Sequence, residues 1–169
     1  MIPLTAPTGR RQTLTAALLA LAMAAVVGTA LGFQHLGGYI PCKLCLEQRL
    51  PYYVGVPLMA LAALSSALGL PGVVTRGLLL AGGLLMAYGV ALGTYHAGVE
   101  WAWWQGPTDC GAVESVDTGG SLLDALNNVV PPSCDKAALR VLGLSFAGWN
   151  VIASLILALA AFRGALARP

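Results

Sequence analysis

The feature that most constrains this chain is the distribution of its charges. Only 9% of its 169 residues are Asp, Glu, Lys or Arg, whereas soluble domains carry about 25%. A chain with so few charges could not cover a surface that faces water on all sides, so we expect an integral membrane protein. The long stretches without any charged residue are 12–42, 50–75, 77–99 and 141–162.

Each stretch is long enough to cross a bilayer as a helix, which takes about 20 apolar residues. The runs are rich in Ala and Leu and show no period of two, so membrane strands are a poor alternative. The sequence therefore predicts an all-α membrane protein, a four-transmembrane-helix bundle that forms one integral membrane domain. The predicted spans lie near 14–33, 51–69, 77–95 and 142–162, and the loops that join them on the outer side lie near 34–50 and 96–141.

The basic residues suggest which way the bundle faces. Five would lie on the side of the two termini (Arg10, Arg11, Arg76, Arg163 and Arg168) and four on the side of the two outer loops (Lys43, Arg49, Lys136 and Arg140). By the positive-inside rule this bias, although small, places both termini in the cytoplasm. A secretory signal peptide over 10–32 is an alternative, but its apolar run is longer than the usual 7–15 residues.

All four cysteines fall in the two outer loops, where disulfides persist. Cys42 and Cys45 form a CxxC pair, which closes too small a loop to stabilise much and therefore suits exchange. A helix begins near Cys45, and Arg49 follows one turn later, so we expect both to favour a Cys45 thiolate. Lys43 should likewise favour a Cys42 thiolate. Arg49 could instead only extend its charge to the membrane surface.

The second pair, Cys110 and Cys134, flanks the middle of the longer loop. Ser121 and Asp124 can cap a helix there, and apolar residues recur at helical spacing. These apolar residues are Leu122, Leu123, Leu126, Val129 and Val130. The sequence predicts a short amphipathic helix that lies on the membrane surface or packs on the end of the bundle.

Several chemistries compete for these residues. Covalent haem attachment needs CxxCH, and Leu46 occupies the histidine position. Haem between His35 and His96 would leave the cysteines without a role. A zinc site of four cysteines needs two closely spaced pairs. A scaffold with inert disulfides remains open, but paired dithiols favour a relay of electrons. The chain has no nucleotide-binding motif, which leaves membrane quinone as the economical acceptor.

The segments around the cysteines are specific in combination. They are Phe33-Gln34-His35, Pro41-Cys42-Lys43-Leu44-Cys45-Leu46-Glu47-Gln48-Arg49, Pro51-Tyr52-Tyr53, Tyr95-His96-Ala97-Gly98-Val99-Glu100-Trp101 and Gly106-Pro107-Thr108-Asp109-Cys110. Together with the four-span layout, they resemble the disulfide bond formation protein B (DsbB) family. A vitamin K epoxide reductase-like protein is the nearest alternative, but in that family the CxxC ends the last span and the loop pair comes early.

The resemblance implies a quinone-dependent thiol oxidase in the bacterial inner membrane, with periplasmic cysteine loops. A reduced periplasmic thioredoxin-fold oxidase (DsbA-like) would attack Cys110 and free Cys134, which would then attack Cys42. Cys45 would pass electrons to quinone, either ubiquinone or menaquinone. Arg49 would orient the quinone, with His96 and His35 as further candidates for binding it. The resemblance implies no metal.

Overall fold

The computed structural model describes residues 7–107, 110 and 133–167, which are mostly helical. Four of its helices are long and apolar enough to cross a membrane: α1 (Arg10–His35), α3 (Leu50–Ala67), α4 (Gly72–Glu100) and α6 (Phe146–Leu166). A short helix, α2 (Lys43–Glu47), directly precedes α3 and continues the same apolar segment. The prediction of a four-helix membrane bundle is confirmed. The amphipathic helix predicted around 121–130 lies outside the described residues.

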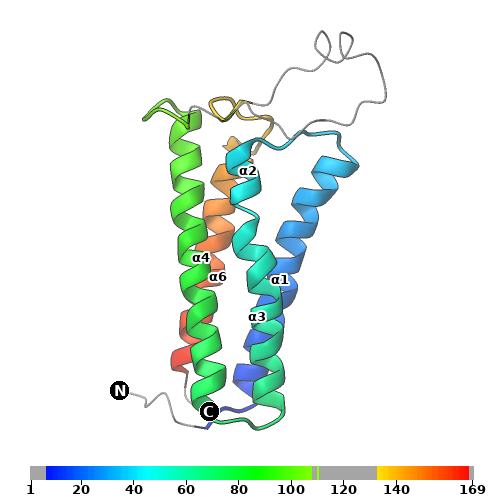
Figure 1. The fold of residues 1–169 in the computed structure, drawn as a ribbon, viewed down its shortest axis with the longest axis vertical. Helices are drawn as coiled ribbons and strands as arrows, with labels where there is room; N and C mark the ends of the chain where they lie inside the picture. The colour runs from blue at the N-terminus through cyan, green and yellow to red at the C-terminus, as the bar shows by residue number, and fades with distance from the viewer. Residues whose placement is uncertain (1–6, 108–109, 111–132, 168–169) are drawn as a thin grey trace.

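The four long helices form a closed bundle in which α4 packs along α6 and α1 along α3. Contacts of α3 with α4 and of α1 with α6 complete it. Figure 1 shows the start of α1 and the end of α6 at one end of the bundle, and the α1–α2 connection with the end of α4 at the other. The buried Arg76 joins the two termini, since its guanidinium donates to the carbonyl oxygens of Pro7 and Ala167.

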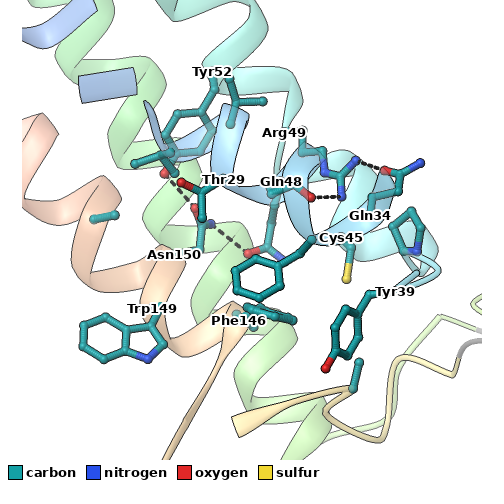
Figure 2. Close-up of a pocket in the computed structure, with 18 of the residues that line it drawn as sticks. Thr29, Gln34, Tyr39, Cys45, Gln48, Arg49, Tyr52, Phe146, Trp149 and Asn150 are labelled. Carbon is teal, nitrogen blue, oxygen red and sulfur yellow. Dashed lines mark hydrogen bonds between the residues drawn. The ribbon is translucent and has the colours of Figure 1, made fainter. Parts of the chain in front are cut away.

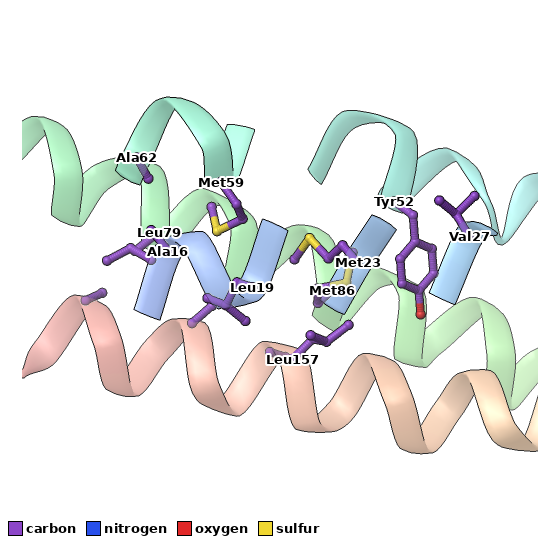
Figure 3. Packing of buried hydrophobic residues seen from close by; sticks show 13 residues of the cluster. Ala16, Leu19, Met23, Val27, Tyr52, Met59, Ala62, Leu79, Met86 and Leu157 are labelled. Carbon is purple, nitrogen blue, oxygen red and sulfur yellow. The ribbon is translucent and has the colours of Figure 1, made fainter. Parts of the chain in front are cut away.

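The centre of the bundle is filled by flexible and small side chains. Met23, Met59 and Met86 belong to this core, and each is fully buried (Figure 3). Gly82 has no Cβ, and the Met59 side chain occupies the space that a Cβ would take. Such glycines let helices approach closely, as is common in membrane bundles, where dispersion contacts rather than water exclusion hold helices together.

Helix α6 begins later than the predicted span because a small hairpin precedes it. Strand β1 (Arg140–Val141) pairs antiparallel with β2 (Leu144–Ser145). Leu142 and Gly143 between them have φ of 53° and 84°, as a two-residue turn of this kind requires at both central positions. Ser145 then caps α6 by accepting a hydrogen bond from the Gly148 N–H (3.2 Å).

Helix α4 continues to Glu100, past the predicted end near residue 95. Its last turn places His96 and Glu100 one above the other on the helix instead of in a loop. Both side chains are buried at the end of the bundle that holds the cysteines. The extra turn therefore carries two titratable side chains to the thiols.

Candidate functional site

The four cysteines gather in one cluster at the end of the bundle. Cys42, Cys110 and Cys134 are buried there against Leu44 and Val99, with the half-buried Cys45 packed beside them. Cys110 and Cys134 form a disulfide, with their Cα atoms 5.8 Å apart. Cys42 and Cys45 are free thiols. The structure therefore brings both cysteine pairs into contact distance and holds them in different redox states.

The two pairs approach each other through Cys42 and Cys134. Their sulfur atoms and a ring nitrogen of His96 all lie within 4.8 Å of one another. Cys42 is 5% exposed and Cys134 is 2% exposed, so water has little access to the space between them. A thiolate formed on either sulfur would face the other sulfur without a side chain in between.

The hydrogen bonds around α2 make the two CxxC thiols differ. Cys42 is the N-cap of α2, and its sulfur accepts a hydrogen bond from the Cys45 N–H (3.3 Å). Its thiol donates to the sulfur of Cys45 at 2.9 Å. This hydrogen bond, together with burial, raises the pKa of Cys42 above its ordinary value. The expected contribution of Lys43 to a Cys42 thiolate stays a prediction, whereas the net pKa of this thiol is raised.

A pocket of about 450 Å³ lies on the other side of Cys45. Residues of α1, the first loop, α3 and α6 line it, and most of them are apolar. The rings of Phe33, Tyr39 and Phe146 all line the pocket and pack on one another. Cys45 lines this pocket, whereas Cys42 and His96 do not. The CxxC thus has one sulfur toward the pocket and one toward the second pair.

Arg49 is the main cation at the pocket. Its guanidinium donates to the side-chain oxygen of Gln34 and to the carbonyl oxygen of Ala30 (3.5 Å). Both partners lie on α1, so Arg49 joins the start of α3 to the opposite wall of the pocket (Figure 2). A guanidinium carries five N–H donors, and it can therefore also donate to an oxygen of a molecule bound beside Cys45.

The two histidine candidates lie in different surroundings. His96 is 3% exposed, with Nε2 at 3.7 Å from the Cys42 sulfur and 3.8 Å from Oε1 of Glu100. His35 ends α1, is exposed and does not line the pocket. Among the described residues, the structure thus places His96 against the thiols and leaves His35 at the surface.

Three polar residues that sequence reasoning missed connect His96 to the pocket. The Gln48 amide nitrogen lies 2.6 Å from Nδ1 of His96, and its oxygen accepts from the Asn150 amide (2.7 Å). The Tyr52 hydroxyl donates to the Asn150 oxygen (2.7 Å). The available signal was the presence of Asn150 and Tyr52 inside otherwise apolar spans, because polar groups in membrane helices commonly serve function.

The cysteine cluster fits a metal centre poorly. Cys42, His96 and Cys134 have donor atoms close enough to surround one ion. However, Cys134 is bonded to Cys110, and a disulfide sulfur is not a thiolate ligand. Only two free donors remain in this group, fewer than the three or four protein ligands that zinc sites use. The arrangement suits thiol exchange better.

A second, smaller hollow of about 210 Å³ lies beside the disulfide. Cys110 and Cys134 line it together with Gly106, Pro107 and residues 133–135. Cys110 is 8% exposed, more than Cys134. Within the described residues, Cys110 is therefore the more exposed cysteine of this disulfide.

Comparison with known proteins gives one match. The model of the family "Disulfide bond formation protein DsbB" matches residues 11–163. This range includes all four long helices except their outermost residues, and every cysteine described above. No curated protein and no solved structure matches the chain significantly.

Proposed function

The chain belongs to the family of disulfide bond formation protein DsbB, and we propose that it is a quinone-dependent thiol oxidase for a periplasmic dithiol protein. Family membership makes it a multi-pass membrane disulfide oxidoreductase. The observation that carries the finer proposal is the position of the CxxC. Cys42 faces Cys134 within 4.8 Å, and Cys45 faces the apolar pocket.

The first exchange takes place at the Cys110–Cys134 disulfide. A partner thiolate attacks the Cys110 sulfur, the bond to Cys134 breaks, and Cys134 leaves as a thiolate. The partner's second thiolate then attacks its own cysteine in the mixed disulfide, so the partner leaves oxidised and Cys110 is reduced. The hollow beside Cys110 and the buried position of Cys134 support this order. A thioredoxin-fold protein resembling DsbA is the partner that we propose.

The second exchange moves the electrons to the CxxC. The Cys134 thiolate attacks Cys42 of a closed Cys42–Cys45 disulfide, and Cys45 leaves as a thiolate into the pocket. Cys110 then attacks Cys134, which restores the Cys110–Cys134 disulfide and releases Cys42. Both CxxC sulfurs are now reduced, which is the arrangement of bonds in this structure. Closing the CxxC again releases two electrons and two protons.

The pocket beside Cys45 fits a quinone ring. Its volume lies within the usual range of small-molecule sites, about 300–1,000 Å³, and its lining is mostly apolar and includes packed aromatic rings. A bound quinone supplies an acceptor for the two electrons and two protons. Arg49 and Gln34 would hold a carbonyl oxygen of the ring, while Cys45 presents its sulfur to it. Ubiquinone and menaquinone share this chemistry.

We place the cysteine end of the bundle in the periplasm and both termini in the cytoplasm, with the chain as one domain in the bacterial inner membrane. The basic residues near the termini support this orientation. Three exposed tryptophans, Trp101, Trp103 and Trp104, follow α4 at the cysteine end, and such residues mark a membrane–water interface. The thiols would then lie where periplasmic proteins and membrane quinone can both reach them.

The proposal is tested by anaerobic titration of the purified chain with a reduced thioredoxin-fold dithiol protein and a soluble quinone. We expect quinone absorbance to fall in step with partner oxidation, one quinone for each disulfide formed. The matched control is the Cys42→Ser chain, which keeps the pocket and the second pair. Partner oxidation without quinone loss, or quinone loss equal in the control, would contradict the proposal.

A further inference from the structure

In the proposed cycle Cys42 must leave as a thiolate, and the other three cysteines do not stabilise that charge. When Cys110 attacks Cys134, the bond between Cys134 and Cys42 breaks, and Cys42 takes the electron pair. A thiol leaves faster as its thiolate becomes more stable. Cys42 is buried, so water contributes little, and its stabilisation depends on N–H donors of the protein.

Two N–H groups point at this sulfur. One is the backbone N–H of Cys45 at 3.3 Å, supplied by the first turn of α2. The other is Nε2 of His96 at 3.7 Å, within reach for a hydrogen bond to sulfur. His96 contributes only if the proton of its neutral ring is on Nε2, because a ring nitrogen without hydrogen would repel a thiolate.

The position of that proton follows from the neighbours of Gln48. The Gln48 amide nitrogen donates to the carbonyl oxygen of Leu44 (3.2 Å), an atom that can only accept. This contact fixes which end of the amide is nitrogen. The same nitrogen lies 2.6 Å from Nδ1 of His96, so Nδ1 must accept. The ring proton is therefore on Nε2, which faces Cys42.

The orientation of Gln48 is held in turn from α6 and α3. The Asn150 amide nitrogen donates to the Gln48 oxygen, and the Asn150 oxygen accepts from the Tyr52 hydroxyl, each at 2.7 Å. Tyr52 is also 2.8 Å from the Ser154 hydroxyl. Every bond in this chain of side chains agrees with a single direction, from Tyr52 through Asn150 and Gln48 to His96 (Figure 2 shows the part that lines the pocket).

We propose that His96 is a thiolate-stabilising donor to Cys42, fixed in that role by the buried chain Tyr52–Asn150–Gln48, and that it serves the thiol side of the site instead of the quinone pocket. This inference rests on the proposed function for its place in the cycle. In that step, the Cys110–Cys134 bond forms, the Cys134–Cys42 bond breaks, and the electron pair stays on Cys42 beside the Nε2–H group. Gln48, Asn150 and Tyr52 are positioning residues.

Other charged and titratable groups lie near Cys42 or near its partners and must stay constant in a test. Cys45 lies on α2, and Glu100 of α4 has Oε1 3.8 Å from the same Nε2. Lys43 is adjacent in sequence. The positive charge of Arg49 attracts a Cys45 thiolate, and that of Arg140 attracts the Glu100 carboxylate. None of these is changed in the variants below except Cys45, which is removed from every chain compared.

The test measures the pH dependence of Cys42 alkylation in the full chain carrying Cys45→Ala, Cys110→Ser and Cys134→Ser. Cys42 is then the only thiol, and iodoacetamide reacts with its thiolate. We expect His96→Phe to move the midpoint of the rate profile upward by about half a pH unit to one unit, the worth of one hydrogen bond. Gln48→Leu should move it in the same direction. The matched control, His35→Phe, changes an exposed histidine at the same end and should leave the midpoint in place.

Loosened packing would admit water to Cys42 and so lower the midpoint, because burial raises the pKa of this thiol. That shift is opposite to the one expected for loss of the His96 donor, so the profile separates positioning from structure. If His96→Phe does not yield a folded chain, Asn150→Leu carries the test, because it leaves His96 in place and removes its support. Equal midpoints in the parent, the folded variants and His35→Phe would overturn the inference. The assay contains neither quinone nor partner, so equal midpoints would not count against the proposed oxidase function. That function is contradicted by a different result, the failure of the unmodified chain to reduce quinone.

Discussion

The sulfur of Cys134 lies within 4.8 Å of the sulfur of Cys42, although the two residues belong to different loops. The short helix α2 holds Cys42 at its N-cap, and the chain returning from the second loop places Cys134 against it. Cys45, one turn of α2 away, points to the pocket instead. One CxxC can therefore exchange with a disulfide on one side and deliver electrons on the other.

Replacing Cys45, the cysteine at the pocket, should stop the transfer of electrons to quinone. We expect Cys45→Ser to abolish quinone reduction, because no other described cysteine lines the pocket. Loss of quinone absorbance after addition of reduced partner measures this directly. The Cys110–Cys134 pair remains in the variant, so one round of partner oxidation should survive. Sustained turnover at the normal rate would show that Cys45 is not the terminal thiol.

Replacing Cys110 in the second pair should have the opposite effect, with partner oxidation lost and quinone reduction kept. Cys110→Ser removes the more exposed cysteine of the disulfide, so oxidation of a protein partner should fall to background. The CxxC should still reduce quinone when a small dithiol such as dithiothreitol supplies the electrons. Partner oxidation and dithiothreitol oxidation are measured in parallel. A variant that oxidises the partner at an undiminished rate would exclude Cys110 as the point of entry.

Arg49→Met should weaken the use of quinone more than exchange between thiols. A hydrogen bond to a charged group contributes about 1.5–3 kcal/mol, so KM for quinone should rise about tenfold or more. The matched control is Arg163→Met, which removes an exposed arginine at the other end of the bundle. Steady-state kinetics with varied quinone give the comparison. An unchanged KM in Arg49→Met would show that Arg49 does not bind quinone and only extends its charge to the membrane surface.

Filling the pocket tests its occupant without touching a polar group. Ala30 lines the pocket on α1, and Ala30→Phe should raise KM for quinone while the purified chain still exchanges with its partner. Ala24→Phe places the same ring on an exposed position of the same helix and serves as control. If both variants use quinone equally well, the acceptor binds elsewhere.

The hydrogen bond between the CxxC thiols should be visible in the titration of Cys42. Donation of its proton to Cys45 raises the pKa of Cys42 most, and burial raises it further. Its thiolate therefore forms only above the ordinary pKa of cysteine, which is about 8.5. In a chain with serine at 110 and 134, Cys45→Ala removes the acceptor and should lower the pKa of Cys42. The alkylation profile of Cys42 should then shift to lower pH. A shift upward would mean that Cys45 does not accept the Cys42 proton.

The sequence predicted the architecture and the cysteine pairs because both depend on local composition. Charge-free runs of sufficient length indicate helices in a membrane whatever their neighbours are, and CxxC with Arg49 is visible without coordinates. The start of α6 was placed too early because Leu142 and Gly143 form a turn that hydropathy does not register. The end of α4 was placed too early because the polar ends of membrane helices resemble loops.

Most of the surroundings of the site required the fold. The pocket combines α1, α3 and α6, and no single segment indicates which faces these helices present to one another. Gln48, Asn150 and Tyr52 form one hydrogen-bonded chain only after α3 and α6 pack. The two histidines looked equivalent in sequence, and only packing distinguishes the buried His96 from the exposed His35.

The relay between the two cysteine pairs is tested most directly by peptide mapping of the Cys45→Ser, Cys110→Ser double variant under non-reducing conditions. Only Cys42 and Cys134 remain, and mild oxidation should join them in an intramolecular disulfide in nearly every molecule. The single-pair chain Cys42→Ser, Cys110→Ser serves for comparison, with Cys45 and Cys134 left. We predict a Cys42–Cys134 peptide in the first and little linkage in the second. Free thiols at Cys42 and Cys134 after oxidation, or equal linkage in both chains, would contradict the account.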